Sequence, residues 1–144
     1  NLQAQAQAWN MRYQAVEEAL AHTPGLKLIS RPKEESYVGS SIQFLLLDWT
    51  PDRVDNLLAR CASRGVELKW FGGKEPTGFT SRYDSWRYAP SSAMPKSDRI
   101  LAGVIDMRLP LTFSLEDCAV IGRIIRAEVG ALYQLADSAA QTAI

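Results

Sequence analysis

The sequence predicts one α+β domain in which helices pack on a small antiparallel or mixed sheet. Its 144 residues suffice for a single hydrophobic core and are too few for two ordinary domains. The composition, with 47% hydrophobic and 22% charged residues, is typical of a globular protein. Long segments with helical spacing of apolar residues alternate with short apolar runs that resemble strands. We therefore expect residues 1–144 to form one domain.

The first predicted helix covers Leu2–Thr23. Its apolar face repeats at steps of three and four residues, and Pro24-Gly25 ends it. The residues of this face are Trp9, Tyr13, Val16 and Leu20. A short strand is expected at Leu26–Ser30.

Ser41–Asp48 is the best strand candidate. Both sets of alternating positions are largely apolar, so a central strand covered on both sides is expected, although a short apolar run can also be a buried helix. A helix should follow, with Thr50 as N-cap, Pro51 at its first position and Gly65 after its end. The alternation in Val66–Phe71 predicts another strand.

The last part of the chain predicts a short helix at Lys96–Gly103 and a strand at Val104–Leu109. Ser114, followed by an acid three residues later, predicts the start of the final helix as a near capping box. Its buried stripe comprises Leu115, Cys118, Ile121, Ile125, Val129 and Leu132. Arg123, Arg126 and Glu128 are expected on its outer face.

Charge and rare residues exclude several function classes. Sixteen basic and sixteen acidic residues balance, so we expect no nucleic-acid partner. No apolar run reaches the roughly 20 residues of a membrane span, and we expect no membrane partner and a cytoplasmic location. Cys61 and Cys118 lie on apolar stripes and are expected to be buried, and with one histidine, His22, no metal site is expected.

Gly72–Pro95 shows no regular period and is rich in glycine, proline, aromatic residues and arginine. Such a long irregular segment inside a small domain often carries function. Arg82 is its leading candidate, because a guanidinium offers a planar pair of donors that matches a carboxylate. Arg82 could equally stack on a neighbouring aromatic ring or pair with Asp84, and Arg87 is a weaker candidate for the same role.

The order of several short motifs resembles the carboxyl-terminal small domain of fold-type I aminotransferases, most closely the DegT/DnrJ sugar aminotransferases. The motifs are Pro95-Lys96-Ser97-Asp98-Arg99-Ile100-Leu101, Leu109-Pro110 and Glu116-Asp117, after a helix that ends in Gly65-Val66. The resemblance covers roughly residues 12 to 130. It implies an α+β small domain that closes over an active site built by a large domain. The chain begins at Asn1 and not at Met, and we expect a C-terminal fragment of a longer enzyme.

The resemblance also implies pyridoxal phosphate as the cofactor of the whole enzyme, bound in the large domain by a Schiff-base lysine. None of the five lysines here lies in that sequence context, and no glycine-rich phosphate loop is present. We expect no cofactor-binding, catalytic or metal residue in this chain, which should be inactive alone. Its expected partners are the large domain of the same protein and further copies in a homo-oligomer.

The expected contribution to substrate binding comes from Arg82, Tyr83, Trp86 and Trp70. In several branches of the resembled fold, an arginine of the small domain binds the substrate α-carboxylate. The aromatic residues could line the pocket, or they could fill the gap between loop and sheet. The loop sequence departs from the usual family pattern, so the substrate stays open. An autonomous small-molecule-binding or dimerisation module without catalysis is the alternative.

Overall fold

Four helices and a four-stranded sheet make up the computed structural model, which describes residues 1–75, 77, 87–88 and 92–142, without the side chains of 136–142. The elements are α1 (Leu2–Leu20), β1 (Leu26–Leu28), β2 (Ser41–Leu46), α2 (Pro51–Ser63), β3 (Lys69–Trp70), α3 (Pro95–Leu101), β4 (Val104–Arg108) and α4 (Leu115–Thr142). The strand order is β1-β2-β4-β3, and every pair is antiparallel. The predicted α+β fold class is confirmed.

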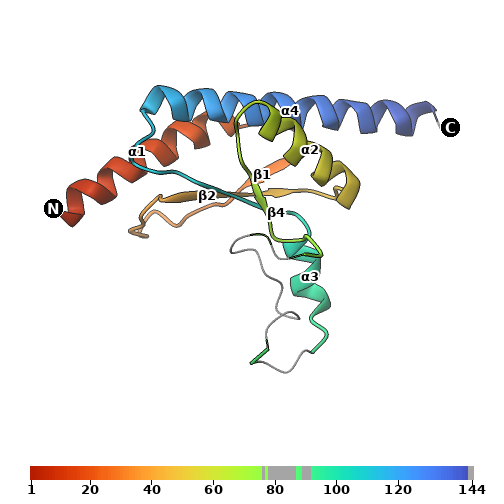
Figure 1. Cartoon of the computed structure of the whole chain (residues 1–144), viewed down its shortest axis with the longest axis horizontal. Helices are drawn as coiled ribbons and strands as arrows, with labels where there is room; N and C mark the ends of the chain where they lie inside the picture. The colour runs from red at the N-terminus through yellow and green to blue at the C-terminus, as the bar shows by residue number, and fades with distance from the viewer. Residues whose placement is uncertain (76, 78–86, 89–91, 143–144) are drawn as a thin grey trace.

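Helices α1, α2 and α4 lie on the same side of the sheet, while α3 lies on the other side (Figure 1). The core fills the space between the sheet and the first three helices. One continuous cluster joins Tyr13 of α1, Phe44 of β2, Leu57 of α2 and Ile125 of α4. Both cysteines are buried in this cluster, as predicted. No described helix has the length and apolar character needed to cross a membrane.

Helix α1 ends at Leu20, three residues before the predicted end. His22 has a left-handed backbone, with φ of 60°, and this conformation cannot continue a helix. The hydroxyl of buried Thr23 donates to the carbonyl of Leu20 at 2.7 Å and closes the turn. Gly25, with φ of 75°, leads the chain into β1.

Strand β2 is central, as predicted, but its two faces differ. Ile42, Phe44 and Leu46 are buried under the helices, whereas Gln43 and Leu45 on the other face are only half-buried. The expectation of a strand covered on both sides is therefore wrong for this chain. The strand is also shorter than predicted, and the backbone of Asp48 is left-handed, with φ of 58°.

Helix α2 follows the predicted signals. Pro51 is its first residue, and the carbonyl of Thr50 accepts from the backbone N–H groups of Arg53 and Val54. The Thr50 side chain itself makes no capping hydrogen bond. Gly65 adopts φ of 81° after the helix end, the usual reason for glycine there. The strand that follows is two residues long, shorter than the predicted Val66–Phe71.

Helix α4 begins with the predicted capping box. The backbone N–H of Asp117 donates to the Ser114 hydroxyl at 3.0 Å, and the Asp117 carboxylate accepts from the Ser114 backbone N–H at 2.8 Å. The Ser114 hydroxyl also donates to this carboxylate at 2.7 Å, and the hydrogen bonds from the Ser114 hydroxyl and backbone N–H lower the pKa of Asp117. Leu115, expected in the buried stripe, is 41% exposed, because it lies in the first turn beyond the facing elements.

The expectation that Glu128 lies on the outer face of α4 is wrong. Its side chain is 7% exposed and faces α2, where Arg60 Nε donates to it at 2.5 Å and an Arg64 amine at 2.8 Å. Both arginines lie on the same side of α2, at the fourth-residue spacing of one helix face. This ion-pair cluster connects α2 to α4 above the core.

Helices α1 and α4 pack closely. A Cβ at Gly122 of α4 would lie 2.5 Å from the Cβ of Ala19, so only glycine permits this approach. Arg12 of α1 also holds the segment before α4, since its guanidinium donates to the carbonyls of Phe113 at 2.6 Å and Leu111 at 3.0 Å. The start of α4 is thereby fixed against α1.

Candidate functional site

Three of the four predicted substrate-binding residues, Arg82, Tyr83 and Trp86, lie outside the described residues. Trp70 of β3 is described, and it is half-buried against the core. In the sheet it pairs with Ile105 of β4. Its indole Nε1 donates to the carbonyl of Ala102 at 2.8 Å. These are packing contacts within the domain, and the part of Trp70 in substrate binding stays a prediction.

The backbone after β3 passes close to this indole. A Cβ at Gly72 would lie 2.6 Å from Trp70 Nε1 and 2.7 Å from the Ala102 Cα. Glycine is therefore required at residue 72 by contacts within the domain. Gly73 has no such close contact, with its nearest neighbour atoms 3.6 Å or more from an added Cβ.

A hollow of about 600 Å³ adjoins Trp70, between the start of α2 and the segment after β3. Its charged lining residues are Asp52 and Asp55 of α2, Lys69 of β3, and Lys74 with Glu75 beyond it. Carboxylates and ammonium groups are mixed around it, so no single sign of charge dominates. Thr77 also lines it, which places the hollow at the beginning of the irregular segment that carries Arg82 in the sequence.

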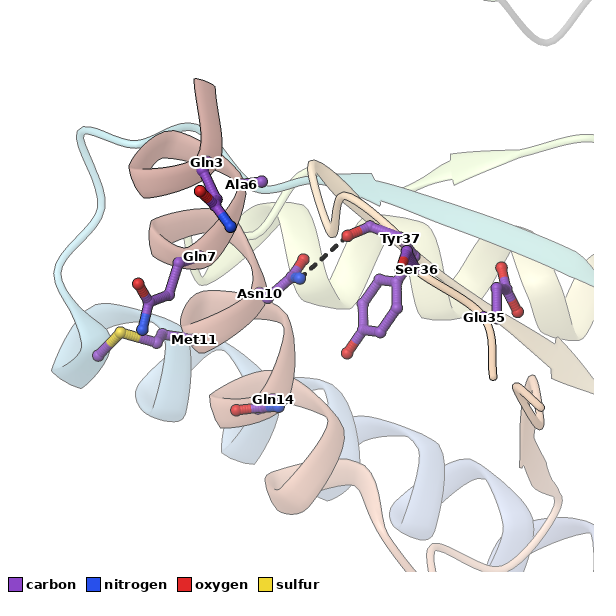
Figure 2. A pocket seen from close by; sticks show the side chains of 9 residues that line it. All are labelled: Gln3, Ala6, Gln7, Asn10, Met11, Gln14, Glu35, Ser36 and Tyr37. Atoms are coloured by element: carbon purple, nitrogen blue, oxygen red, sulfur yellow. Dashed lines mark hydrogen bonds between the residues drawn. The ribbon is translucent and has the colours of Figure 1, made fainter. Parts of the chain in front are cut away.

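A second hollow, of about 550 Å³, lies along the N-terminal half of α1 and was not anticipated from the sequence (Figure 2). Its helix side presents the amides of Gln3, Gln7, Asn10 and Gln14 with Met11, and Glu35, Ser36 and Tyr37 line the other side. In the sequence, the only sign of this hollow is the helical spacing of the amide side chains along α1. Glutamines at that spacing are usual on a solvated helix face, so the spacing does not predict a site.

Asn10 fixes the wall of this second hollow. Its amide donates to the carbonyl of Tyr37 at 3.0 Å, as Figure 2 shows, and its side-chain oxygen accepts from the backbone N–H of Gly39 at 2.7 Å. The guanidinium of Arg31 stacks 4.5 Å from the centroid of the Tyr37 ring and pairs with Glu35 at 2.8 Å. Glu35 is the one carboxylate among the residues that line this hollow, and it is already paired with Arg31.

Neither hollow contains an activated nucleophile among the described residues. Desolvation raises the pKa of the Cys61 thiol to about 12, and burial also raises the pKa of Cys118. The thiolate needed for nucleophilic attack is therefore disfavoured at both cysteines. Within the described part of the chain, no three histidine, cysteine or carboxylate side chains come together as a metal site.

The described residues do not fit pyridoxal phosphate. All five lysines are described; Lys69 is half-buried, and the other four, Lys27, Lys33, Lys74 and Lys96, are exposed. Free backbone N–H groups at a helix N-terminus are a common site for a phosphate. At the start of α4, the Ser114 backbone N–H already donates to the Asp117 carboxylate and the Asp117 backbone N–H to the Ser114 hydroxyl, and α2 begins with Pro51 and Asp52. The carboxylates of Asp117 and Asp52 repel a phosphate, and Pro51 has no backbone N–H to donate to it.

Solved structures with the same fold are aminotransferases. The aminotransferase TlmJ from Streptoalloteichus hindustanus matches 89% of this chain with a TM-score of 0.71 and 15% identity. DesI, solved in the presence of its TDP-sugar product, matches 92% with a TM-score of 0.66 and 14% identity. A DegT DnrJ EryC1 StrS aminotransferase from Brucella abortus matches 90% with a TM-score of 0.62 and 19% identity. No protein-family model and no curated protein sequence matches the chain.

The chain spans only about a third of these proteins, because the matches cover 32%, 33% and 32% of their respective lengths. At 14–19% identity the likeness concerns the fold. The resemblance that the motifs indicate is confirmed at this level: the chain has the fold of one third of a DegT/DnrJ-type aminotransferase.

Proposed function

We propose that the chain is the C-terminal small domain of a pyridoxal-phosphate-dependent aminotransferase. In this role it closes over an active site that the large domain of the same protein builds. The observation that carries the proposal is the coverage of the fold matches, about nine-tenths of this chain against one third of each aminotransferase. A domain with this role needs no set of catalytic residues of its own.

The described residues do not fit pyridoxal phosphate, and this supports a cofactor site in the large domain. The cofactor supplies the amino-transfer chemistry when bound, and the longer protein must hold it outside residues 1–144. What remains for this chain is substrate positioning and exclusion of water from the closed cleft.

Arg82 is the residue that we propose to contact the substrate, with Tyr83, Trp86 and Trp70 around the same loop. A guanidinium binds a carboxylate or a phosphate through two parallel hydrogen bonds and stays charged at any working pH. The substrate is either an amino-acid carboxylate or a phosphorylated sugar. The TDP-sugar product named for DesI supports the sugar for a protein of this fold.

Kinetics of the full-length enzyme test this role. Arg82→Ala should lower kcat/KM by about 1.5–3 kcal/mol, the scale of a charged hydrogen bond, mainly through a higher KM. Arg82→Lys should recover little, because an ammonium group cannot form the bidentate pair. Arg126→Ala, at an exposed residue of α4, is the matched control and should leave both constants unchanged. Unchanged kinetics in both Arg82 variants would give Arg82 a structural role.

A further inference from the structure

Helices α1, α2 and α4 cover one face of the sheet; in the described part of the chain only α3 lies on the other face, which we name the open face. The open face carries three rows of side chains that the strand register defines. Leu45 and Val104 form the first row with Lys27, Gln43 and Asp106 the second with Lys69, and Ser41 and Arg108 the third. Helices α1, α2 and α4 all lie on the opposite side, as Figure 1 shows.

The first row continues into an apolar groove. Leu45 and Leu47 line it from β2 and its end, and Ile100 lines it from α3, around a volume of about 500 Å³. Leu47 is 50% exposed and Ile100 is 60% exposed, although both are large aliphatic side chains. We name Leu45, Leu47, Ile100 and Val104 the open-face patch.

The second row is polar, but its central carboxylate is shielded from solvent. Asp106 is only 8% exposed and accepts from the Gln43 amide at 3.2 Å. Basic side chains, Lys27 and Arg99, lie exposed beside the open-face patch. An apolar centre with a polar surround is typical of a surface between domains, which is more polar than a core.

From these observations we infer that the open face is the surface on which the large domain of the longer protein packs, with the open-face patch at its centre. The inference rests on the proposed function. The fold matches leave two thirds of the aminotransferase chains without a counterpart here, so a covering layer of the required size exists in proteins of this fold. Exposed Asp48 lines the same groove as Arg99, so the charges beside the patch are two basic and one acidic, and they favour a covering surface with both signs of charge at its edge.

Hydroxyl-radical footprinting of the full-length protein and of the 144-residue chain tests the inference. Labelling of Leu47 and Ile100 should be about threefold or more lower in the full-length protein, because an interface core excludes water. Val120 of α4, 39% exposed on the helix side, is the internal control and should be labelled equally in both proteins. Equal labelling of Leu47 and Ile100 in the two proteins would overturn the inference.

Two further measurements distinguish a failure of the open-face inference from a failure of the proposed function. Aminotransferase activity of the same full-length preparation tests the proposed function, so an active enzyme with an unprotected patch refutes the open-face inference alone. Sedimentation of the 144-residue chain tests a second copy as the occupant. A dimer that Leu47→Asp with Ile100→Asp converts to a monomer would assign the patch to self-association and contradict the inference. A chain that stays monomeric, with protection in the full-length protein, supports it.

Discussion

The two faces of the sheet have different physical roles. On the covered face, Ile42, Phe44 and Ile105 are fully buried and join three helices in one core. On the open face, Gln43, Leu45 and Val104 are half-buried, although they belong to the same two strands. The comparison shows that the buried core of the described residues lies on one face, while the other face presents half-buried residues beside α3.

The largest difference between the faces should appear when neighbouring residues of β2 are truncated. Phe44→Ala should cost about 3–5 kcal/mol, because it removes a fully buried ring and leaves a cavity. Leu45→Ala, at the next residue on the open face, should cost less than about 1.5 kcal/mol in the 144-residue chain. Urea unfolding followed by circular dichroism measures both. Equal losses would show that both faces contribute alike to the core.

A second, smaller effect concerns the charged cluster on the helix side. Glu128→Gln should cost about 1–2 kcal/mol, since it removes the charge that Arg60 and Arg64 share but leaves two arginines that can still be hydrated. Arg123→Gln, on an exposed part of the same helix, is the matched control and should change the free energy of unfolding little. No loss in the Glu128 variant would show that the cluster adds nothing to the packing of α2 on α4.

The pH dependence of this difference follows from the pKa of Glu128. The hydrogen bond from Arg64 lowers this pKa below its ordinary value of 4.5, against the opposing effect of desolvation. The unfolded chain therefore binds a proton at a higher pH than the folded chain, and the contribution of Glu128 is lost as the pH falls below about 4.5. Unfolding at pH 7 and pH 3 should show the wild type and Glu128→Gln converging in acid. A constant difference would exclude the charge as its source.

The smallest expected effect is that of the open-face patch in the 144-residue chain. Leu47→Ser with Ile100→Ser should change the free energy of unfolding by less than about 1 kcal/mol, because Leu47 is already 50% exposed and Ile100 60% exposed. The same urea titration measures it. A loss as large as that of Phe44→Ala would show that the patch belongs to the core.

The sequence predicted the elements that depend on local signals. Pro51 with Gly65 delimited α2, and Ser114 with Asp117 placed the start of α4, because capping and backbone conformation are local properties. The apolar run that contains Leu45 and Leu47 predicted a fully covered strand, and this was wrong because an apolar pattern does not show how much of each face the other elements cover.

Long-range contacts could not be predicted from the sequence, for a different reason. Glu128 resembles any solvated residue of an amphipathic helix, and its partners lie 64 and 68 residues earlier in the chain. Arg12 likewise bonds to carbonyls about a hundred residues away, which carry no residue-specific signal. The candidate site was predicted from the composition of the loop Gly72–Pro95 and from the resemblance to aminotransferases, and of its four residues Trp70 alone could be compared with the structure.

The central claim is that a longer protein divides the work between this domain and a cofactor-binding domain. The most direct test is borohydride reduction of the full-length protein with pyridoxal phosphate, followed by digestion and mass spectrometry of the modified lysine. We predict one pyridoxyl-lysine, in a peptide outside residues 1–144. Stoichiometric modification of Lys27, Lys33, Lys69, Lys74 or Lys96 of this chain, with none elsewhere, would contradict the account.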